Sequence, residues 1–217
     1  MNPQRIAFPI LFQRQDDPDR AADIIVDLVK NHIPRRFQLD PFDEIQVLSP
    51  MHKGTVGAAN LNLRLQQALN PEGEALQRGE RLYRLGDKVM QKHNDYEKGV
   101  FNGDIGQIFA VQHDMVYVRY PEQDVKYEGA EIDEITLAYA ITVHKSQGSE
   151  YHTVIMALVN SHSIMLQRNL FYTAVTRAKR KVILVGTKRA VQTAVQNQRT
   201  SRRFTLLIPR LQGELLT

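Results

Sequence analysis

The sequence predicts an α/β protein with a small β-rich domain inserted into it. Short apolar strands alternate with helical segments in the two outer parts of the chain, 1–75 and 137–217. Between them, residues 76–136 form short β-rich pieces at close spacing, separated by turn signals. The 217 residues are enough for one or two domains with sizeable cores. We therefore expect helices packed on a sheet, interrupted by a small antiparallel barrel or hairpin array.

The first part of the chain has the order helix, strand, loop, helix. An Asp-Pro pair at 17–18 is typical of a helix start, and apolar residues at helical spacing then predict a helix over 18–32. The apolar run 45–48 predicts a strand. A second helix is expected from about 56 to 69, where an Asn-Pro breaker ends it. This order is the beginning of an α/β layer.

The middle and last parts continue these two patterns. The expected strands of the inserted domain are 88–91, 106–111, 115–119 and 125–128. In the last part, strands are expected at 153–159 and 181–186, with one helix near 167–179 and another at 188–197. The stretch 198–217 is basic and then apolar, and it is interpreted either as a docking segment or as an end that needs a partner.

Composition excludes several classes of protein. No apolar run approaches the roughly 18 residues that a membrane span needs. The absence of cysteine excludes disulfides, thiolate metal sites and cysteine nucleophiles. The first ten residues lack the basic and then apolar pattern of a leader, so we expect a cytoplasmic protein. The seven histidines have no spacing suited to a metal, and no metal site is expected.

The charge is unevenly distributed. The net charge is +4, but residues 162–217 hold 11 Lys and Arg against one acid, and residues 1–161 hold 17 against 23. A basic end on a body without excess positive charge is typical of a protein that binds phosphates. By composition alone, a solvated helix and a loose basic tail explain the charges equally well.

Residues 140–150 are the strongest candidate for a functional site. The apolar residues 140–143 predict a strand that leads into an expected helix start. The polar residues that follow are His144, Lys145, Ser146 and Gln147. Backbone N–H groups and side-chain donors at such a turn suit an anion such as a phosphate. The alternative is a capped helix in which Thr142 and Ser146 bind backbone groups, and the density of polar residues favours the functional interpretation.

A second candidate segment is 168–180. Its apolar residues occupy more than one helical face, so the expected helix is largely buried. Arg177 among them is either packed on a carboxylate or directed at a ligand. A planar guanidinium that is always charged is suited to the charge that develops on a phosphoryl group in transfer.

Together these segments resemble a known family. The stretches VHKSQGSE at 143–150 and FYTAVTRAKRKVILVG at 171–186 resemble the fifth and sixth motifs of superfamily 1 helicases. The sequence of these stretches is most similar to that of the RecD-like branch, which contains the helicase subunit of exodeoxyribonuclease V and its stand-alone relatives. The stretches 47–71 and 86–108 also resemble that branch.

The resemblance implies a fold and a function. The fold is the second RecA-like motor domain, a parallel sheet flanked by helices, with a small inserted barrel of the Src-homology-three type. In this family ATP, with Mg²⁺, binds between two RecA-like domains, and single-stranded DNA crosses both. The implied activity is ATP-driven 5′ to 3′ translocation and DNA unwinding in recombination and repair, with a first motor domain and, in some members, nuclease or helicase subunits as partners.

The resemblance also implies roles for individual residues. Arg177 corresponds to the arginine finger on the γ-phosphate of ATP. Gln147, Gly148 and Glu150 correspond to residues beside the nucleotide, with Glu150 near its ribose. The residues expected to line the DNA path are Thr142, His144, Lys145, Ser146, Asn94, Asn102, His52 and Lys53.

One departure from the family pattern limits the mechanism. The chain contains no G-x-x-x-x-G-K-[ST] loop and no apolar run ending in Asp-Glu that could bind Mg²⁺. The family places both in the first motor domain, which is expected to precede Met1, so we interpret the chain as a C-terminal part. Phosphoryl transfer needs the phosphate cradle and the metal as well as the arginine. We therefore expect this chain alone to have no ATPase or unwinding activity.

Two other functions remain open at this point. One is a non-catalytic module that binds single-stranded nucleic acid, DNA or RNA. Bases would then stack on barrel aromatics, although such residues more often belong to a core; the candidates are Tyr96, Phe101, Tyr117 and Tyr120. The other is the helicase part of a conjugative relaxase, whose motifs are similar.

Overall fold

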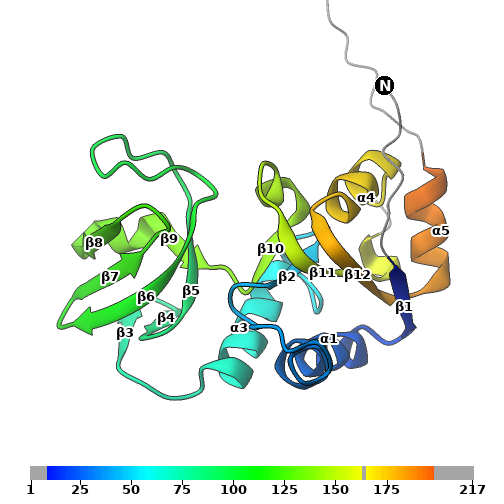
Figure 1. Ribbon diagram of the computed structural model, residues 1–217, viewed down its shortest axis with the longest axis horizontal. Coiled ribbons are helices and arrows are strands. Elements are labelled where there is room, and N and C mark those ends of the chain that lie inside the picture. The colour runs from blue at the N-terminus through cyan, green and yellow to red at the C-terminus, as the bar shows by residue number, and fades with distance from the viewer. Residues whose placement is uncertain (1–8, 163–164, 198–217) are drawn as a thin grey trace, which may run out of the picture.

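The computed structural model describes residues 9–162 and 165–197. The expectations for 198–217 lie outside the described residues. Figure 1 shows two bodies side by side, a parallel sheet with helices on both faces and an antiparallel barrel. The sheet takes its strands from both ends of the chain, and the barrel takes its strands from the middle.

The parallel sheet has five strands. In spatial order these are β1 (Ile10–Arg14), β12 (Ala178–Gly186), β11 (Tyr151–Leu158), β2 (Ile45–Ser49) and β10 (Ala140–Thr142). Every neighbouring pair is parallel. The expected strands at 45–48, 153–159 and 181–186 are therefore confirmed, and β1 at the sheet edge was missed. All five residues of β1 are exposed, and they form a strand because each pairs with a residue of β12.

Helices cover both faces of this sheet. They are α1 (Pro18–Asp27), the π-helical turn η1 (Leu28–His32), α2 (Ile33–Phe37), α3 (Ala58–Leu69), α4 (Arg168–Val175) and α5 (Lys188–Gln196). Alternate strand residues point to opposite faces. Val47 and Ile155 pack in the cluster with α1 and α3, whereas Leu48 and Met156 pack in the cluster with α4 and α5. Figure 1 shows α1 and α3 below the sheet and α4 and α5 above it.

Two helices differ from their expected lengths. The helix expected over 18–32 continues to residue 37. Pro34 has no N–H to donate to a regular helical hydrogen bond, and the chain passes this residue through a π-helical turn at 28–32. The helix expected over 167–179 ends at Val175. Residues 176 and 177 form a turn, and Ala178 already pairs with Tyr151 as the start of β12. Strand pairing with β11 therefore overrides the helical pattern at that end.

The barrel occupies residues 75–137. Its main sheet has the order β8 (Asp124–Glu128), β7 (Met115–Arg119), β6 (Ile105–Gln112), β5 (Lys88–Gln91) and β9 (Ile135–Leu137), and the hairpin β3 (Ala75–Arg78) and β4 (Arg81–Arg84) lies beside it. The sheet is antiparallel throughout. The four expected strands are confirmed. The short strands β3, β4 and β9, of three or four residues each, were missed.

A buried polar junction joins the barrel to the parallel sheet. The amide of Asn62 on α3 donates to the carbonyl oxygens of Leu137 and Ala140, at 3.0 and 2.8 Å, and its oxygen accepts from the Ala140 N–H at 2.8 Å. The amide of Gln46 on β2 donates to Ala138 and Tyr139 carbonyl oxygens, both at 3.1 Å. Side chains of the sheet and of α3 thus form hydrogen bonds with the backbone C=O and N–H groups at the point where the chain leaves the barrel.

Asp87, which is fully buried, is a second part of this junction. Its carboxylate accepts hydrogen bonds from Gln66 and Asn70 on and after α3, at 2.5 and 2.7 Å. It also accepts from the Arg84 N–H at 2.7 Å and from the Tyr139 hydroxyl at 2.9 Å. Burial raises the pKa of Asp87 above its ordinary value, although these donors oppose the rise. The four donors fix the barrel against α3.

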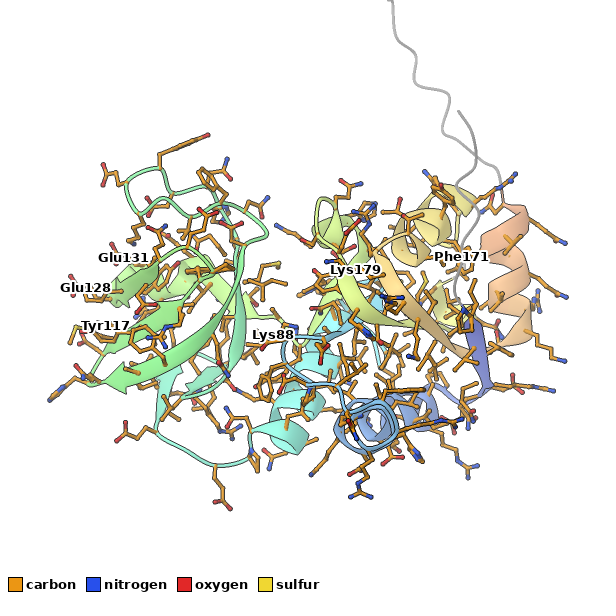
Figure 2. All side chains as sticks on the ribbon, viewed as in Figure 1. Lys88, Tyr117, Glu128, Glu131, Phe171 and Lys179 are labelled. Carbon is orange, nitrogen blue, oxygen red and sulfur yellow. The ribbon has the colours of Figure 1, made fainter. Side chains whose placement is uncertain are left out.

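Lys88 enters the junction from the neighbouring position. Figure 2 shows it between the two bodies. Its ammonium donates to the carbonyl oxygens of Phe42, at 2.5 Å, and Ile45, at 3.4 Å. Burial lowers the pKa of Lys88 to about 8, although Asp43 and Asp40 act in the opposite direction. Keeping this ammonium charged in the folded protein therefore costs stability at neutral pH.

The buried Lys88 predicts a pH-dependent stability. Between about pH 8 and pH 10.5 the unfolded chain holds a proton on this lysine that the folded chain has released, so the free energy of unfolding rises with pH in that window. The gain is at most about 1.4 kcal/mol per pH unit. Urea unfolding between about pH 7.5 and 9.5 should show this rise in the wild type and not in Lys88→Met.

The matched control is Lys126→Met, which removes an ammonium that is about half exposed and pairs with Glu128 at 2.7 Å. It should keep the pH dependence of the wild type. An identical pH profile in wild type and Lys88→Met would show that Lys88 does not release its proton in this range.

Candidate nucleic-acid and nucleotide sites

A groove of about 730 Å³ runs between the barrel and the parallel sheet. Its walls come from the loop after β2, from α3, from the barrel and from β10. The apolar part of the lining is Ala58, Ala59, Leu63, Leu82, Met90, Leu137, Ala140 and Ile141. The groove is thus a product of the junction, because neither body forms it alone.

The ionisable side chains that line this groove are mostly basic. They are Arg81, Lys92, Lys145, His52, His93 and one acid, Glu80. The pKa of Lys92 is lowered, chiefly by burial and then by repulsion from Arg81 and Lys145, and nearby Asp133 and Glu134 oppose this. Cations that repel one another across a groove favour the binding of an anion, which relieves the repulsion.

The structure brings several of the expected DNA-path residues together here. His52, Thr142 and Lys145 line the groove. The Lys145 ammonium donates to the Asn102 side-chain oxygen at 2.5 Å, and the Asn102 N–H donates to the Asn94 side-chain oxygen at 3.0 Å. The loop of the barrel that carries both asparagines thus reaches the turn after β10. Sequence reasoning anticipated this group without showing that its members meet.

Three expected residues are placed differently. Lys53 and His144 are exposed but do not line the groove. Ser146 is fully buried, and its hydroxyl donates to the Val143 carbonyl oxygen at 2.7 Å. The expectation that Ser146 faces DNA is therefore not supported, because the side chain has no exposed surface and its donor is already used. The capping role considered for this residue is the one that the structure shows.

Sequence reasoning missed Arg81, Lys92 and His93. Lys92 and His93 follow directly after β5, and Arg81 begins β4. Basic residues directly after a strand are a weak signal, because such positions are usually solvated surface. Only the packing of the barrel against α3 and β10 shows that these side chains share one groove.

The turn after β10 is a 3₁₀-helix, η3 (Val143–Ser146), where an α-helix start was expected. Gln147 follows it, and Gly148 then adopts a left-handed conformation with φ of +89°. A Cβ at Gly148 would have no neighbour within 4 Å, so the glycine serves the backbone turn and not close packing. Gln147, Gly148 and Glu150 are all exposed.

Arg177 lies beside this turn. Its guanidinium donates to the Ser149 carbonyl oxygen at 3.2 Å and, through Nε, to the Thr173 carbonyl oxygen at 3.3 Å. The Tyr151 N–H donates to the Arg177 carbonyl oxygen at 2.8 Å. Within the described part of the chain, no carboxylate forms an ion pair with this guanidinium. Among the described residues, the half-buried guanidinium of Arg177 is thus held by neutral oxygens and not by a carboxylate.

Glu150 lies near one oppositely charged side chain in the described part of the chain. Its carboxylate lies 3.9 Å from the Lys179 ammonium, and both side chains are more than half exposed. Figure 2 labels Lys179 beside the parallel sheet. An exposed pair at this distance contributes little to stability. Glu150 therefore remains available to a ligand.

The two candidate sites lie at opposite ends of the parallel strands. Thr142 pairs with Ser49 at the carboxyl end of β10, and Leu48 pairs with Met156. Thr142 is therefore level with the far end of β11, about 20 Å along the strand direction from Tyr151 at its amino end. Residues 143–150 cross this distance, and α4 packs on η3 along the way. One short segment thus connects the two sites.

The four candidate aromatic residues of the barrel differ in exposure. Tyr120 is buried, and its hydroxyl forms a hydrogen bond with Tyr127 at 2.8 Å, so it belongs to the core. Tyr117 is half-buried beside Phe109. Tyr96 and Phe101 are exposed.

In 9–162 and 165–197, no group of three His, Asp or Glu side chains is placed to hold a metal ion. None of the helices in those ranges has both the length and the apolar character to cross a bilayer.

Comparison with known families supports the interpretation of both bodies. Residues 61–120 match a family described as the ATP-dependent RecD-like DNA helicase SH3 domain. Residues 137–185 match the UvrD-like helicase C-terminal domain. The first range includes most of the barrel, and the second includes β10, η3 and Arg177.

Individual relatives agree with these families. The ATP-dependent RecD2 DNA helicase of Deinococcus radiodurans is 40% identical over 163 residues, which are 75% of this chain and 23% of the relative. The RecBCD enzyme subunit RecD of Mycolicibacterium smegmatis is 33% identical, over 76% of this chain and 29% of the relative. The chain thus spans about a quarter of the length of these relatives.

A solved structure shows the same fold. The Pif1 helicase from Bacteroides, in complex with ADP-AlF3 and ssDNA, aligns with a TM-score of 0.54 and 18% identity, over 93% of this chain and 55% of that chain. The expected RecA-like parallel sheet with an inserted barrel of the Src-homology-three type is confirmed. The two family matches and the RecD relatives show that the chain belongs to the RecD-like helicase family.

Proposed function

We propose that this chain contributes the DNA grip and the arginine finger to an ATP-dependent DNA helicase of the RecD-like type. The observation that carries the proposal is the basic groove between the barrel and the parallel sheet. Relatives named RecD2 and RecD favour this function over that of a conjugative relaxase. The Bacteroides Pif1 structure of the same fold contains ssDNA, and we propose single-stranded DNA as the ligand of this groove.

In the proposed complex the backbone of the strand lies along the groove. Lys92 and Lys145 bind phosphates, and Thr142 and Asn102 donate hydrogen bonds from the two sides. The apolar wall formed by residues such as Met90 and Ile141 excludes water from these contacts. His52 and His93 lie within the same lining and extend the path.

We also propose that the turn 147–150 and Arg177 form one side of an ATP site. Arg177 is half-buried and charged, and its hydrogen-bond partners among the described residues are neutral, which suits a group that stabilises charge on a transferring γ-phosphate. Gln147, Gly148 and Glu150 lie beside it, with Glu150 proposed for the ribose. Bound ATP would bring Mg²⁺, and a first motor domain would supply the phosphate cradle and the metal ligands.

Translocation follows if the two sites are coupled. The segment 143–150 begins at the groove and ends at the nucleotide side, so a shift of the turn on ATP binding or hydrolysis changes the position of Lys145. We propose 5′ to 3′ movement, in recombination and repair in the cytoplasm. A nuclease or helicase subunit is a proposed partner, since one relative is a subunit of a RecBCD enzyme.

Removing two groove cations should weaken DNA binding. In Lys92→Ala with Lys145→Ala, the affinity for a labelled oligothymidine should fall about tenfold or more at low salt, because two phosphate contacts are lost. The slope of log affinity against log salt should become shallower by about 1.4, at about 0.7 per contact on a single strand. Fluorescence anisotropy across a salt series measures both quantities.

The control removes the same charge elsewhere. Lys126→Ala with Lys188→Ala changes one lysine on β8 and one at the start of α5, neither of which lines the groove. If both double variants lose equal affinity, DNA binding depends only on net charge, and the groove is not the DNA path.

Ser146→Ala should separate stability from DNA binding. The variant should lose about 1 kcal/mol in the free energy of unfolding, because the Val143 carbonyl oxygen loses its donor. Its DNA affinity should stay within about twofold of the wild type, since the buried hydroxyl contacts no ligand. Gln147→Ala, at an exposed position, should leave stability unchanged. A large loss of affinity in Ser146→Ala with unchanged stability would restore this residue to the DNA path.

The isolated chain should not hydrolyse ATP. Arg177 cannot replace the missing phosphate cradle and metal ligands, because catalysis requires all of them together. Phosphate release in the presence of single-stranded DNA should equal that of a blank. DNA-dependent turnover that disappears in Arg177→Ala would show that this chain contains a complete site.

A further inference from the structure

The loop that joins β5 and β6, residues 92–104, has a fixed shape. Its outer part is closed by two backbone hydrogen bonds between Asp95 and Val100, at 2.8 and 3.0 Å. The Asp95 carboxylate accepts from the backbone N–H groups of Glu97 and Lys98, at 3.0 and 2.9 Å. These N–H groups, that of Lys98 above all, hold the pKa of Asp95 below its ordinary value.

The barrel anchors this loop from below. The Lys98 ammonium lies 3.0 Å from the Glu131 carboxylate and 4.9 Å from the centre of the Tyr127 ring. The Gln123 amide donates to the Lys98 carbonyl oxygen at 2.6 Å. Val100 is buried in the core. Figure 1 shows the loop standing out from the barrel, above the sheet. The loop is therefore prearranged, although it projects into solvent.

Two aromatic rings are presented on this loop. Tyr96 and Phe101 follow the two ends of the closing bridge, and their ring centres are 5.8 Å apart at an interplanar angle of 75°. They are 79% and 45% exposed. Exposing two large apolar rings on an anchored loop is unfavourable for folding, and such a pair is typical of a contact surface.

The aromatic pair adjoins the basic groove. Phe101 directly precedes Asn102, whose side-chain oxygen accepts from Lys145 in the groove. On the other side, the Asn94 amide donates to the Tyr96 hydroxyl at 3.4 Å and the Asn94 oxygen accepts from Asn102. The two rings thus flank the asparagines through which the loop contacts Lys145.

We propose that Tyr96 and Phe101 form a stacking platform for an unpaired base of the single strand in the groove. The inference rests on the proposed DNA path and adds a contact to the bases. Because every base has a flat face, the contact is independent of sequence, as a translocating motor requires. The loop is already ordered, so binding loses little conformational entropy on this side.

The first experiment compares two oligonucleotides and two variants of the 217-residue chain. Tyr96→Leu with Phe101→Leu should bind oligothymidine about tenfold more weakly than the wild type, with an unchanged salt slope, because phosphate contacts remain. On an oligonucleotide with the same phosphates but abasic sugars, wild type and variant should bind equally. The matched control is Phe109→Leu with Tyr117→Leu, a second aromatic pair with ring centres 6.1 Å apart on β6 and β7, which should bind like the wild type.

A second experiment does not depend on the loss of a side chain. The chain has no tryptophan, so Tyr96→Trp introduces a single indole at the platform. Its fluorescence should be quenched when oligothymidine binds and should change little with the abasic oligonucleotide.

The outcomes separate the two proposals. Normal binding by the Leu variant together with an unquenched indole would overturn the platform and leave the groove as the DNA path. If the wild type binds neither oligonucleotide at low salt, the groove and the platform both fail. If the Leu variant loses equal affinity for both oligonucleotides, the rings contact the backbone or shape the loop, and base stacking is wrong.

Discussion

The groove depends on one constraint, the buried polar junction between the barrel and the parallel sheet. Asp87 is fully buried and accepts four hydrogen bonds, and Lys88 beside it donates to the loop before β2 and to β2 itself. Such groups are costly to bury and tolerate little displacement, because any shift leaves a charge without partners. They therefore hold the barrel in one orientation on α3. That orientation places the basic side chains along one groove and brings the loop that carries Asn102 into contact with Lys145.

The segment 143–150 joins the two candidate sites, and its two halves have different surroundings. Its first half is fixed by the buried Ser146 and by packing on α4, and it holds Lys145 at the groove. Its second half is an exposed turn through Gly148, beside Arg177. Buried anchors and exposed ligand groups alternate over eight residues. Ser146, in the middle of this polar stretch, is therefore buried and bonded to the backbone, whereas its polar neighbours keep some exposed surface.

The candidate sites were only partly predictable from the sequence. The motif residues Lys145, Thr142 and Arg177 could be found because donors and a guanidinium are concentrated in short stretches. Lys92 and Arg81 could not, since each is a single basic residue in a different strand or loop, and their mutual repulsion arises only when the barrel packs on α3. The exposure of Tyr96 and Phe101, in contrast to the buried Tyr120, also needed the structure, because aromatic residues of a small barrel have the same local pattern inside and outside.

The sequence by itself determined the α/β class, the inserted β-rich segment and the main strands, because these follow from local apolar periodicity and turn residues. Tertiary structure decided where several elements end. The helix before Arg177 stops at Val175 because β12 pairs with β11 from Ala178 onward, and β1 is a strand because it pairs with β12. Tertiary structure also decided which charged side chains lie close together. Pairing and charge repulsion act between residues far apart in the chain, and no local pattern contains that information.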